Sequence, residues 1–273
     1  MKFTKMEGLG NDYIYVDAIT QNISYDKDWI TKISDRHFGI GADGLIALEK
    51  SDSHDFKMRM FNSDGSEGKM CGNGIRCLAK FAYDHHFTED THIRFETLSG
   101  TRIVDLKKEN DQITGAIVDM GEPEIKTSLI PMKSENETCV DQPIVIDGQQ
   151  IIGTAVSMGN PHFVIFVDKM PEDIETLGRK IETSSYFPEQ VNVEFVEVIN
   201  DEHIKMRVWE RGSGETFACG TGACACMYAS YLTKRTKDHV KVTLLGGDLN
   251  IHLNDDHHIM MEGPATTVFE GEI

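Results

Sequence analysis

An internal duplication constrains this chain more than any other sequence feature. The segment RMFNSDGSEGKMCGNGIRCLAKFAYD, which begins at position 59, aligns without a gap with RVWERGSGETFACGTGACACMYASYL, which begins at position 207. The aligned pairs include Arg59 and Arg207, Phe61 and Trp209, Glu67 and Glu215, Cys71 and Cys219, Gly72 and Gly220, Gly74 and Gly222, and Tyr83 and Tyr231. Such an alignment indicates two homologous halves.

Each half shows the same succession of expected elements. Alternating or β-branched segments between Gly, Asn and Asp predict strands at residues 56–61, 93–97, 113–118, 193–198, 204–209 and 240–244. Amphipathic helices are expected at 28–35 and 173–182, and helices directly after the cysteines at 72–85 and 220–234. In the two helices after the cysteines, small and apolar side chains occur around most of the circumference. We therefore expect protein to pack around these helices on all sides. The prediction is an α+β fold in which each half is a mainly antiparallel sheet or barrel wrapped around a central helix.

The length of the chain favours two domains. A chain of 273 residues is long enough for two medium-sized hydrophobic cores. We expect an N-terminal half over residues 1–119 and a C-terminal half over residues 120–264, joined by the polar, proline-punctuated stretch 121–143. The final segment, residues 265–273, is expected to pack back on the first half.

The composition argues against several classes of function. The formal net charge is −18 and the sequence pI is about 4.9, so long-range repulsion would oppose binding to nucleic acid or to an anionic membrane. No stretch approaches membrane-spanning length, and the start MKFTKMEG lacks the apolar run of a secretory signal. We therefore expect a cytoplasmic protein whose partner is a small molecule.

The six cysteines indicate individual thiols. They are too sparse for a disulfide scaffold in a chain of this length. Zinc is the main competing interpretation, yet no C-x-x-C pair occurs, and Cys224 and Cys226 would point in different directions on a helix. We therefore expect no metal. The residues interpreted as small buried hydrophobes are Cys77, Cys139, Cys224 and Cys226.

Cys71 and Cys219 occupy the same position in the two copies, between a Gly-containing turn and a Gly-x-Gly helix start. The unpaired N–H groups and the helix dipole at such a position favour negative charge, which can lower a thiol pKa and hold an anionic ligand. Two such helix starts, related by approximate two-fold symmetry, would place one thiol on each face of a bound carbon.

This arrangement predicts a reaction. Inverting a stereocentre requires removal of a proton from one face and delivery of a proton to the other. The converging N–H groups would stabilise carbanion charge as it spreads into a carboxylate, without pyridoxal phosphate or a metal. We therefore predict a cofactor-independent amino-acid epimerase with Cys71 and Cys219 as its acid/base pair. Oxidation sensitivity is also expected, because facing thiols can form a disulfide.

The chain resembles the diaminopimelate epimerase family over essentially its whole length. The resemblance rests on six motifs in order: GLGNDYIYVD, DRHFGIGADGL, FNSDGSEGKMCGNGIRC, MGNPHFVIF, FPEQVNVEF and WERGSGETFACGTGACA. Proline racemases and hydroxyproline epimerases resemble the same architecture, but their first cysteine motif typically continues with Gly-His, whereas Asn73 follows Gly72 here. Phenazine-biosynthesis isomerases share the fold without the cysteine pair.

The resemblance implies a reaction and roles for individual residues. The reaction would interconvert LL- and meso-2,6-diaminopimelate, a step towards lysine and cell-wall precursors, in a family whose members are often homodimers. Cys71 and Cys219 would be catalytic, and His162 and Glu210 would support them. The residues implied in substrate binding are Asn11, Asn62, Gly72, Asn73, Asn160, Asn192, Glu210, Arg211, Gly220 and Thr221. An arginine with several amides is also a physically reasonable grip on a distal amino-acid head group.

One position departs from the family pattern, and alternative functions stay open. Some family members have a glutamine after the aspartate that corresponds to Asp43, whereas Gly44 follows it here, so a polar contact at the site mouth is expected to be absent or supplied differently. The alternatives are a related cofactor-independent racemase, a non-catalytic amino-acid-binding protein and a cysteine hydrolase. A hydrolase needs one nucleophile and an orienting histidine, so the duplicated cysteines have no role in its chemistry.

Overall fold

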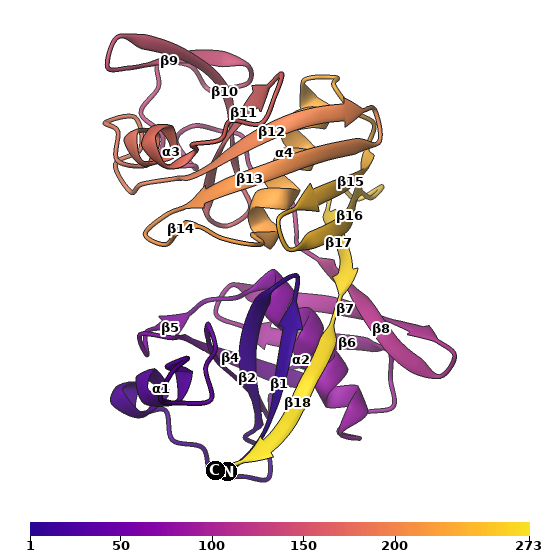
Figure 1. The fold of residues 1–273 in the computed structure, drawn as a ribbon. Helices are drawn as coiled ribbons and strands as arrows, with labels where there is room; N and C mark the ends of the chain where they lie inside the picture. Colours follow the sequence, from indigo (N-terminus) through magenta and orange to yellow (C-terminus); the bar gives the residue numbers. More distant parts are fainter. The chain divides into compact units, whose positions relative to one another are not determined.

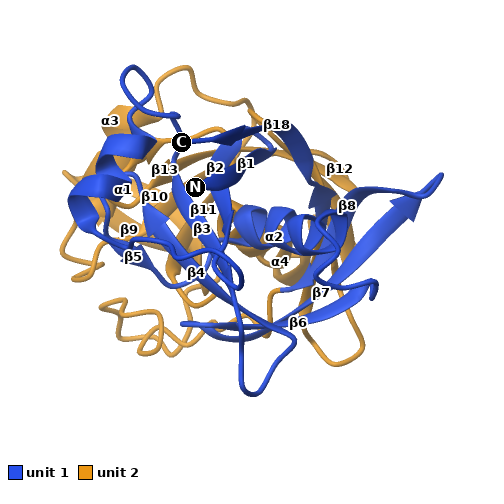
Figure 2. Ribbon diagram, turned by 90° about the horizontal axis from the view of Figure 1, so that it is seen from below, with its two compact units in different colours: residues 1–119, 262–273 blue, residues 120–261 orange.

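The computed structural model describes residues 1–273 and divides into two compact units, coloured separately in Figure 2. Unit 1 contains residues 1–119 and 262–273, and unit 2 contains residues 120–261. Each unit is built mainly from strands and contains two helices. None of the four helices combines the length and the apolar composition that a membrane-crossing helix needs.

The elements are labelled in Figure 1, except β3, which is labelled in Figure 2. Unit 1 contains β1 (Lys2–Gly8), β2 (Asn11–Asp17), α1 (Lys27–Ser34), β3 (Gly44–Glu49), β4 (Phe56–Asn62), β5 (Glu67–Gly68), α2 (Gly72–Asp84), β6 (His92–Thr97), β7 (Gly100–Glu109), β8 (Gln112–Asp119) and β18 (Thr266–Glu272). Unit 2 contains β9 (Gln142–Ile146), β10 (Gln149–Ser157), β11 (Pro161–Val167), α3 (Glu175–Glu182), β12 (Asn192–Asn200), β13 (His203–Glu210), β14 (Gly214–Glu215), α4 (Gly220–Leu232), β15 (His239–Leu244) and β16 (Gly247–Leu253). Strand β17 (Ile259–Pro264) belongs partly to each unit.

The two units share one order of strand pairing. In unit 1, β1 and β2 form an antiparallel hairpin, β2 runs parallel to β3, β3 pairs antiparallel with β4, and β4 runs parallel to β6. In unit 2, β10, β11, β12, β13 and β15 repeat these pairings in the same order. Parallel neighbours need a crossover connection, which helices α1 and α2 supply in unit 1 and α3 and α4 supply in unit 2.

The strand β18 completes unit 1. It pairs antiparallel with β1, from Lys2 opposite Glu272 to Glu7 opposite Thr266. The two ends of the chain therefore lie side by side in this unit (Figure 1).

The helices that follow the cysteines are the central helices of their units. α2 packs against β1, β2, β3, β7 and β8, and α4 packs against β10 to β13, β15 and β16. Buried side chains occur around most of each helix, from Ile75 to Ala82 in α2 and from Ala223 to Ser230 in α4. The predicted fold class is confirmed, because strands surround a central helix in each unit.

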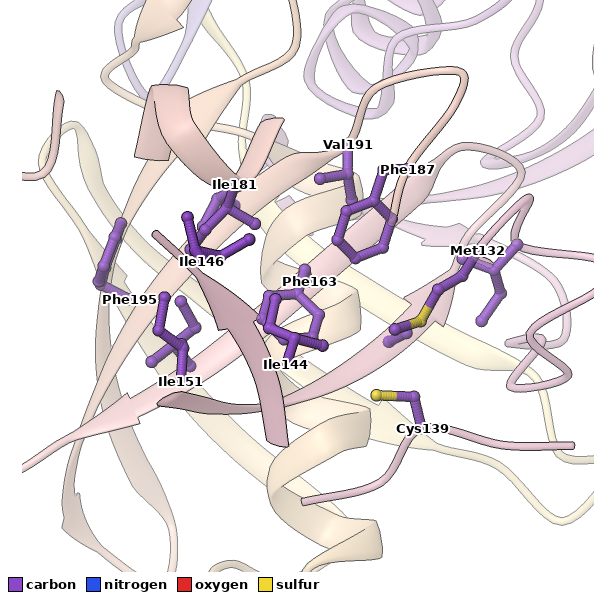
Figure 3. Close-up of a cluster of buried hydrophobic side chains, with 14 of the residues drawn as sticks. Met132, Cys139, Ile144, Ile146, Ile151, Phe163, Ile181, Phe187, Val191 and Phe195 are labelled. Carbon is purple, nitrogen blue, oxygen red and sulfur yellow. The ribbon is translucent and has the colours of Figure 1, made fainter. Parts of the chain in front are cut away.

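An apolar cluster in unit 2 joins α3 to the sheet (Figure 3). Ile181 of α3 lies in this cluster with Phe163 of β11 and Phe195 of β12, and each is almost completely buried. Gly153 of β10 makes room for the Phe163 ring, because a Cβ at this position would lie 2.3 Å from the ring atom Cζ. Full burial of each such side chain stabilises the folded state by about 1.5–3 kcal/mol.

A repeated ion pair braces the hairpin before each cysteine. In unit 1 the Arg59 guanidinium lies 2.7 Å from the Glu67 carboxylate, between β4 and β5. In unit 2 the Arg207 guanidinium lies 2.6 Å from the Glu215 carboxylate, between β13 and β14. The arginines and glutamates that the alignment matches therefore form the same contact in each unit.

Gly44 is the position at which some members of the resembled family have a glutamine. Its backbone conformation is one that only glycine tolerates. Its φ is +154°, and a Cβ would lie 1.9 Å from the carbonyl oxygen of Phe61 in the paired strand β4. This position therefore contributes no polar side chain. The close approach of β3 to β4 gives the physical reason.

Candidate active site

Cys71 and Cys219 are the N-caps of the two central helices. Both have extended backbones, with φ −132° at Cys71 and φ −118° at Cys219. The sulfur of Cys71 accepts a hydrogen bond from the Gly74 N–H at 3.3 Å, and that of Cys219 accepts one from the Gly222 N–H at 3.4 Å. These bonds satisfy one of the N–H groups that a helix start leaves without an intrahelical partner.

The glycines in the first turn allow close packing around each sulfur. A Cβ on Gly74 would lie 2.5 Å from Cδ1 of Ile46 and 3.5 Å from the Cys71 sulfur. A Cβ on Gly222 would lie 2.8 Å from Oε1 of Glu194 and 3.2 Å from the Cys219 sulfur. At Gly74 and Gly222 the first turn therefore leaves room for the atoms packed against it, where a larger side chain would collide with them.

In unit 1 the neighbour of the thiol is an amide. Cys71 is partly buried, and its thiol donates to Oδ1 of Asn11 at 3.2 Å. Asn11 begins β2 directly after a turn in which Leu9 and Gly10 both have positive φ, so the β1–β2 hairpin aims this amide at the helix start. Nδ2 of Asn11 donates to Asp43 at 2.8 Å.

A network of charged side chains lies behind Asn11. The Arg36 guanidinium lies 2.8 Å from Asp43 and 2.6 Å from Asp12, and the Lys5 ammonium lies 2.7 Å from Asp12. Burial raises the pKa of Asp12, but the hydrogen bonds from Arg36 and Lys5 outweigh this effect and hold the pKa below its usual 3.8. Asp43, which is paired with Arg36, therefore holds the Asn11 amide in place.

The other predicted residues of unit 1 divide into two places. Gly72 and Asn73 form the first turn of α2 beside Cys71, and both are buried. Asn62 is exposed at the end of β4, opposite Gly44, and its Nδ2 donates to the Ser66 hydroxyl at 3.0 Å. The fold thus brings Asn11, Gly72 and Asn73 to the thiol and leaves Asn62 at the surface of the turn before β5.

In unit 2 the neighbours of the thiol are carboxylates. Cys219 is only 6 % exposed, and Glu210, at the end of β13, hydrogen-bonds this thiol and the Thr216 hydroxyl. Burial raises the pKa of Glu210 above its usual value. Burial also raises the pKa of Cys219 well above 9.0, and the charges of Glu210 and Glu194 add to this effect.

The lowering of a thiol pKa at a helix start is therefore outweighed at Cys219. Burial destabilises the thiolate of Cys219 by more than the helix dipole and the Gly222 N–H stabilise it. The charges of Glu210 and Glu194 raise the pKa further. The two cysteines have equivalent positions in the repeat but different surroundings, so they are not chemically equivalent.

A chain of hydrogen bonds leads from Cys219 to two completely buried side chains, His162 and Glu194. The Cys219 sulfur lies 3.5 Å from the Thr221 hydroxyl, which accepts a hydrogen bond from Nδ2 of Asn160 at 3.3 Å. Oδ1 of Asn160 lies 3.1 Å from Nε2 of His162, and Nδ1 of His162 lies 2.6 Å from Glu194. Gly220 is buried in the first turn of α4, beside Thr221.

Asn192 holds two backbone segments together. Its Nδ2 donates to the Pro161 carbonyl at 2.9 Å, and its Oδ1 accepts from the Arg211 N–H at 2.9 Å. The Arg211 guanidinium donates to the carbonyl of Glu189 at 2.9 Å from the surface of the β13–β14 turn. In unit 2 the fold therefore brings Asn160, His162, Glu210 and the first turn of α4 to Cys219, with Arg211 further out.

Sequence reasoning missed two kinds of residue. The charged group behind Asn11 lies within or beside the motifs GLGNDYIYVD and DRHFGIGADGL, but nothing in these motifs predicts that Arg36 reaches Asp12. Glu194 carried a usable signal, because an acidic residue between Val193 and Phe195 in a buried strand requires a partner. Thr216 lies in the segment between β14 and α4 and gave no signal.

Comparison with known proteins identifies the family. The model of the family described as diaminopimelate epimerase matches residues 3–126 and 154–268. A diaminopimelate epimerase of Methanococcus maripaludis is 53 % identical over 275 aligned residues, which cover 100 % of this chain and 99 % of that protein. The chain belongs to the diaminopimelate epimerase family. The predicted family and the predicted enzyme class, an isomerase, are confirmed.

Solved structures place this family member in a wider group of folds. A probable proline racemase of Agrobacterium radiobacter superposes with a TM-score of 0.73 at 13 % identity, covering 100 % of this chain and 92 % of that one. A phenazine biosynthesis protein of the PhzF family from Bacillus anthracis superposes with a TM-score of 0.70 at 15 % identity, covering 100 % and 98 %. At such low identity these matches concern the fold alone, and they agree with the predicted architecture.

Proposed function

We propose that this member of the diaminopimelate epimerase family interconverts LL- and meso-2,6-diaminopimelate by proton transfer at one α-carbon, in lysine and cell-wall precursor biosynthesis. The observation that carries the proposal is the repeated cysteine-capped helix, one in each unit, in a chain 53 % identical to a protein named for this activity. The proposed chemistry uses the chain's own residues and needs neither pyridoxal phosphate nor a metal.

In the proposed mechanism, Cys71 and Cys219 work on opposite faces of the α-carbon. One sulfur acts as a thiolate and takes the α-proton, and the other acts as a thiol and delivers a proton to the opposite face. The configuration of the substrate decides which cysteine takes which role. The N–H groups at the starts of α2 and α4, including those of Gly72, Asn73, Gly220 and Thr221, stabilise the carbanion as its charge spreads into the carboxylate.

Glu210 is the proposed proton partner of Cys219. It hydrogen-bonds the thiol, and its own pKa is raised by burial. A carboxylate with a raised pKa is a better acceptor for the proton of a buried thiol than an exposed one would be. Glu210 would therefore take the proton from the Cys219 thiol whenever Cys219 must act as the base. His162 would support Cys219 in the same role.

The distal end of the diamino acid would be bound by Arg211 and the asparagine amides. Arg211 offers a guanidinium that matches a carboxylate with two hydrogen bonds. Asn11, Asn62, Asn160 and Asn192, with Glu210, would bind the remaining carboxylate and ammonium groups. This grip would separate a diamino acid from the substrates of simpler racemases.

The direct test is conversion of LL-diaminopimelate by the purified protein in reducing buffer made with heavy water. We expect meso product carrying deuterium at the α-carbon, measured by chiral chromatography and mass spectrometry. A binding protein would give neither product nor deuterium, which would contradict the proposal. Parallel assays with proline, lysine and histidine separate this activity from that of a related racemase.

The placement of the two sulfurs has its own test. Mild oxidation with diamide should join Cys71 and Cys219 in a disulfide, abolish activity, and be reversed by dithiothreitol. Peptide mapping identifies the linkage. A Cys139→Ala variant is the control, because Cys139 is a buried thiol in the apolar cluster of unit 2 and its loss should not prevent the disulfide. Inactivation without this linkage would contradict the facing arrangement.

We also propose that the enzyme works in the cytoplasm as a homodimer and binds no nucleic acid. The six free thiols and the net charge of −18 support a reducing compartment and weak attraction to nucleic acid. Light scattering during size-exclusion chromatography measures the assembly, and a nucleic-acid shift assay tests binding. A monomer over the working concentration range would contradict the dimer.

A further inference from the structure

Glu194 is a buried carboxylate near the start of strand β12. Its side chain is completely buried, and its strand neighbours Val193 and Phe195 are apolar. Its Oε1 lies 2.6 Å from Nδ1 of His162, and its Oε2 has no hydrogen-bond partner in the protein. A buried carboxylate is costly unless it is paired. Its presence in an apolar strand therefore calls for an explanation beyond packing.

The pair of Glu194 and His162 lies directly against the start of α4. His162 is on β11, which runs parallel to β12, and its ring is as fully buried as the carboxylate. Gly222 in the first turn of α4 is so close that a Cβ there would lie 2.8 Å from Oε1 of Glu194. The carboxylate thus lies behind the helix turn that Cys219 caps.

The hydrogen bonds give this pair a direction. Nδ1 of His162 lies against the Glu194 carboxylate, so Nε2 faces Asn160. Nδ2 of Asn160 donates to the Thr221 hydroxyl, so Oδ1 of the same amide faces Nε2 of His162. The contacts therefore run in one line from Glu194 through the His162 ring and the Asn160 amide to the hydroxyl beside the Cys219 sulfur.

We propose that Glu194 is a positioning residue for the Cys219 half of the site, acting through His162, Asn160 and Thr221. It anchors the imidazole ring, the ring fixes the amide of Asn160, and the amide fixes the hydroxyl that contacts the Cys219 sulfur. Glu194 itself touches no reacting atom. This inference rests on the proposed role of Cys219 in epimerisation.

The test compares two substitutions of Glu194 in the full-length enzyme. Glu194→Gln keeps an acceptor for Nδ1–H but removes the charge, and we expect kcat to fall about 10-fold. Glu194→Leu removes the acceptor as well, and we expect a fall of about 10²-fold, because displacement of an acid/base group by a fraction of an ångström has effects of this size. KM should rise by a smaller factor than kcat falls, because Asn160 is the one residue of the proposed distal grip that Glu194 positions.

The second readout needs no substrate. The rate at which iodoacetamide alkylates each cysteine is measured against pH by peptide mass spectrometry, with Cys71 as the internal reference. In Glu194→Gln the pH at which Cys219 becomes reactive should move down, because the Glu194 charge helps to raise the pKa of Cys219. The other titratable groups near Glu194 are His162 on β11, Glu210 on β13 and Cys226 on α4, and all are unchanged in this variant.

Glu197→Gln is the matched control, since it removes the same charge from the same strand. Its carboxylate accepts from the Met170 N–H, and it takes no part in the hydrogen bonds that link Glu194 to Thr221. It should leave kcat and the reactivity of Cys219 unchanged.

Loss of kcat together with altered Cys219 reactivity in Glu194→Gln supports the inference. It is overturned by an unchanged kcat, by a change confined to KM or to thermal stability, by a fall in kcat with unaltered Cys219 reactivity, or by an equal effect of Glu197→Gln. If Glu194→Leu does not fold, Glu194→Gln decides alone. If the wild-type protein shows no epimerase activity, the proposed function fails, whereas the alkylation profile still tests the link between Glu194 and Cys219.

Discussion

Unit 1 and unit 2 present the same cysteine-capped helix to different surroundings. Cys71 is partly buried and donates to a neutral amide, Asn11, behind which lies a group of charged side chains that ranges from the buried Lys5 to the exposed Arg36. Cys219 is almost fully buried, with one carboxylate in contact and a second behind the helix turn. The difference lies in the residues that the rest of each unit brings to the cap.

This difference suits a reaction that needs one thiol and one thiolate at a time. Identical surroundings would give two sulfurs with the same proton affinity, whereas burial and nearby carboxylates favour the protonated form at Cys219. The duplicated motif thus places both thiols at the start of a helix, whereas the different neighbours of the two thiols give them different tendencies to ionise. The predictions below test the two parts of this comparison.

The largest expected effect comes from removal of either sulfur. Cys71→Ala and Cys219→Ala should each lower kcat/KM by about 10³-fold, because each variant lacks one of the two proposed acid/base groups. Steady-state assays in both directions measure the loss, with Cys139→Ala as a control that keeps activity. A hydrolase or an enzyme with a single catalytic thiol would tolerate one of the two substitutions, and that result would break the comparison.

Alanine in the first turn of each helix should have unequal effects. In Gly222→Ala the new Cβ meets the Glu194 carboxylate and the Cys219 sulfur, and we expect kcat to fall about 10²-fold. In Gly74→Ala the nearest atom is the flexible end of Ile46, so the loss should be less than about 10-fold. Equal losses, measured in parallel on folded protein, would show that the neighbours of the two caps do not matter.

The ion pairs of Asp12 with Lys5 and Arg36 in unit 1 should make the stability of the protein depend on pH. Asp12 has a lowered pKa in the folded protein, so its contribution is present above the unfolded value of 3.8 and is lost as the pH falls below it. Asp12→Asn should lower the free energy of unfolding by about 1–3 kcal/mol at pH 7, since it leaves buried charge without its partner. Urea unfolding at pH 7 and pH 3 measures both values. An equal deficit at the two pH values would count against this account.

The smallest expected effect concerns the amphipathic helices of the two units. The side chain of Asp26 caps α1 by accepting from the Trp29 N–H, whereas the cap residue of α3, Ile174, makes no such bond. Asp26→Ala should therefore lower the free energy of unfolding by about 1 kcal/mol, measured by urea unfolding. Ile174→Val, a small apolar change at the matching cap of α3, provides the comparison for lost packing without lost capping.

The elements of the fold were accessible from sequence because their signals are local. The Gly-x-Gly helix start after Cys71 and Cys219, the alternating strand of residues 204–209 and the all-round apolar helix after position 220 each predict an element that the structure contains. The pattern predicts that the second amphipathic helix begins at Asp173, whereas α3 begins at Glu175. Asp173 lies outside the helix, and its side chain accepts from the Thr176 N–H in the first turn.

The sequence by itself determined the duplication, the position of each thiol at a helix start and, through six ordered motifs, the family. These properties depend on neighbours along the chain, which the order of residues specifies directly. Only the tertiary structure decided that Cys219 is buried against Glu210 and that a chain from Glu194 reaches it. Such contacts join residues from different strands, and the pKa of a thiol depends on its distance from water and from charges that the chain brings together only when it folds.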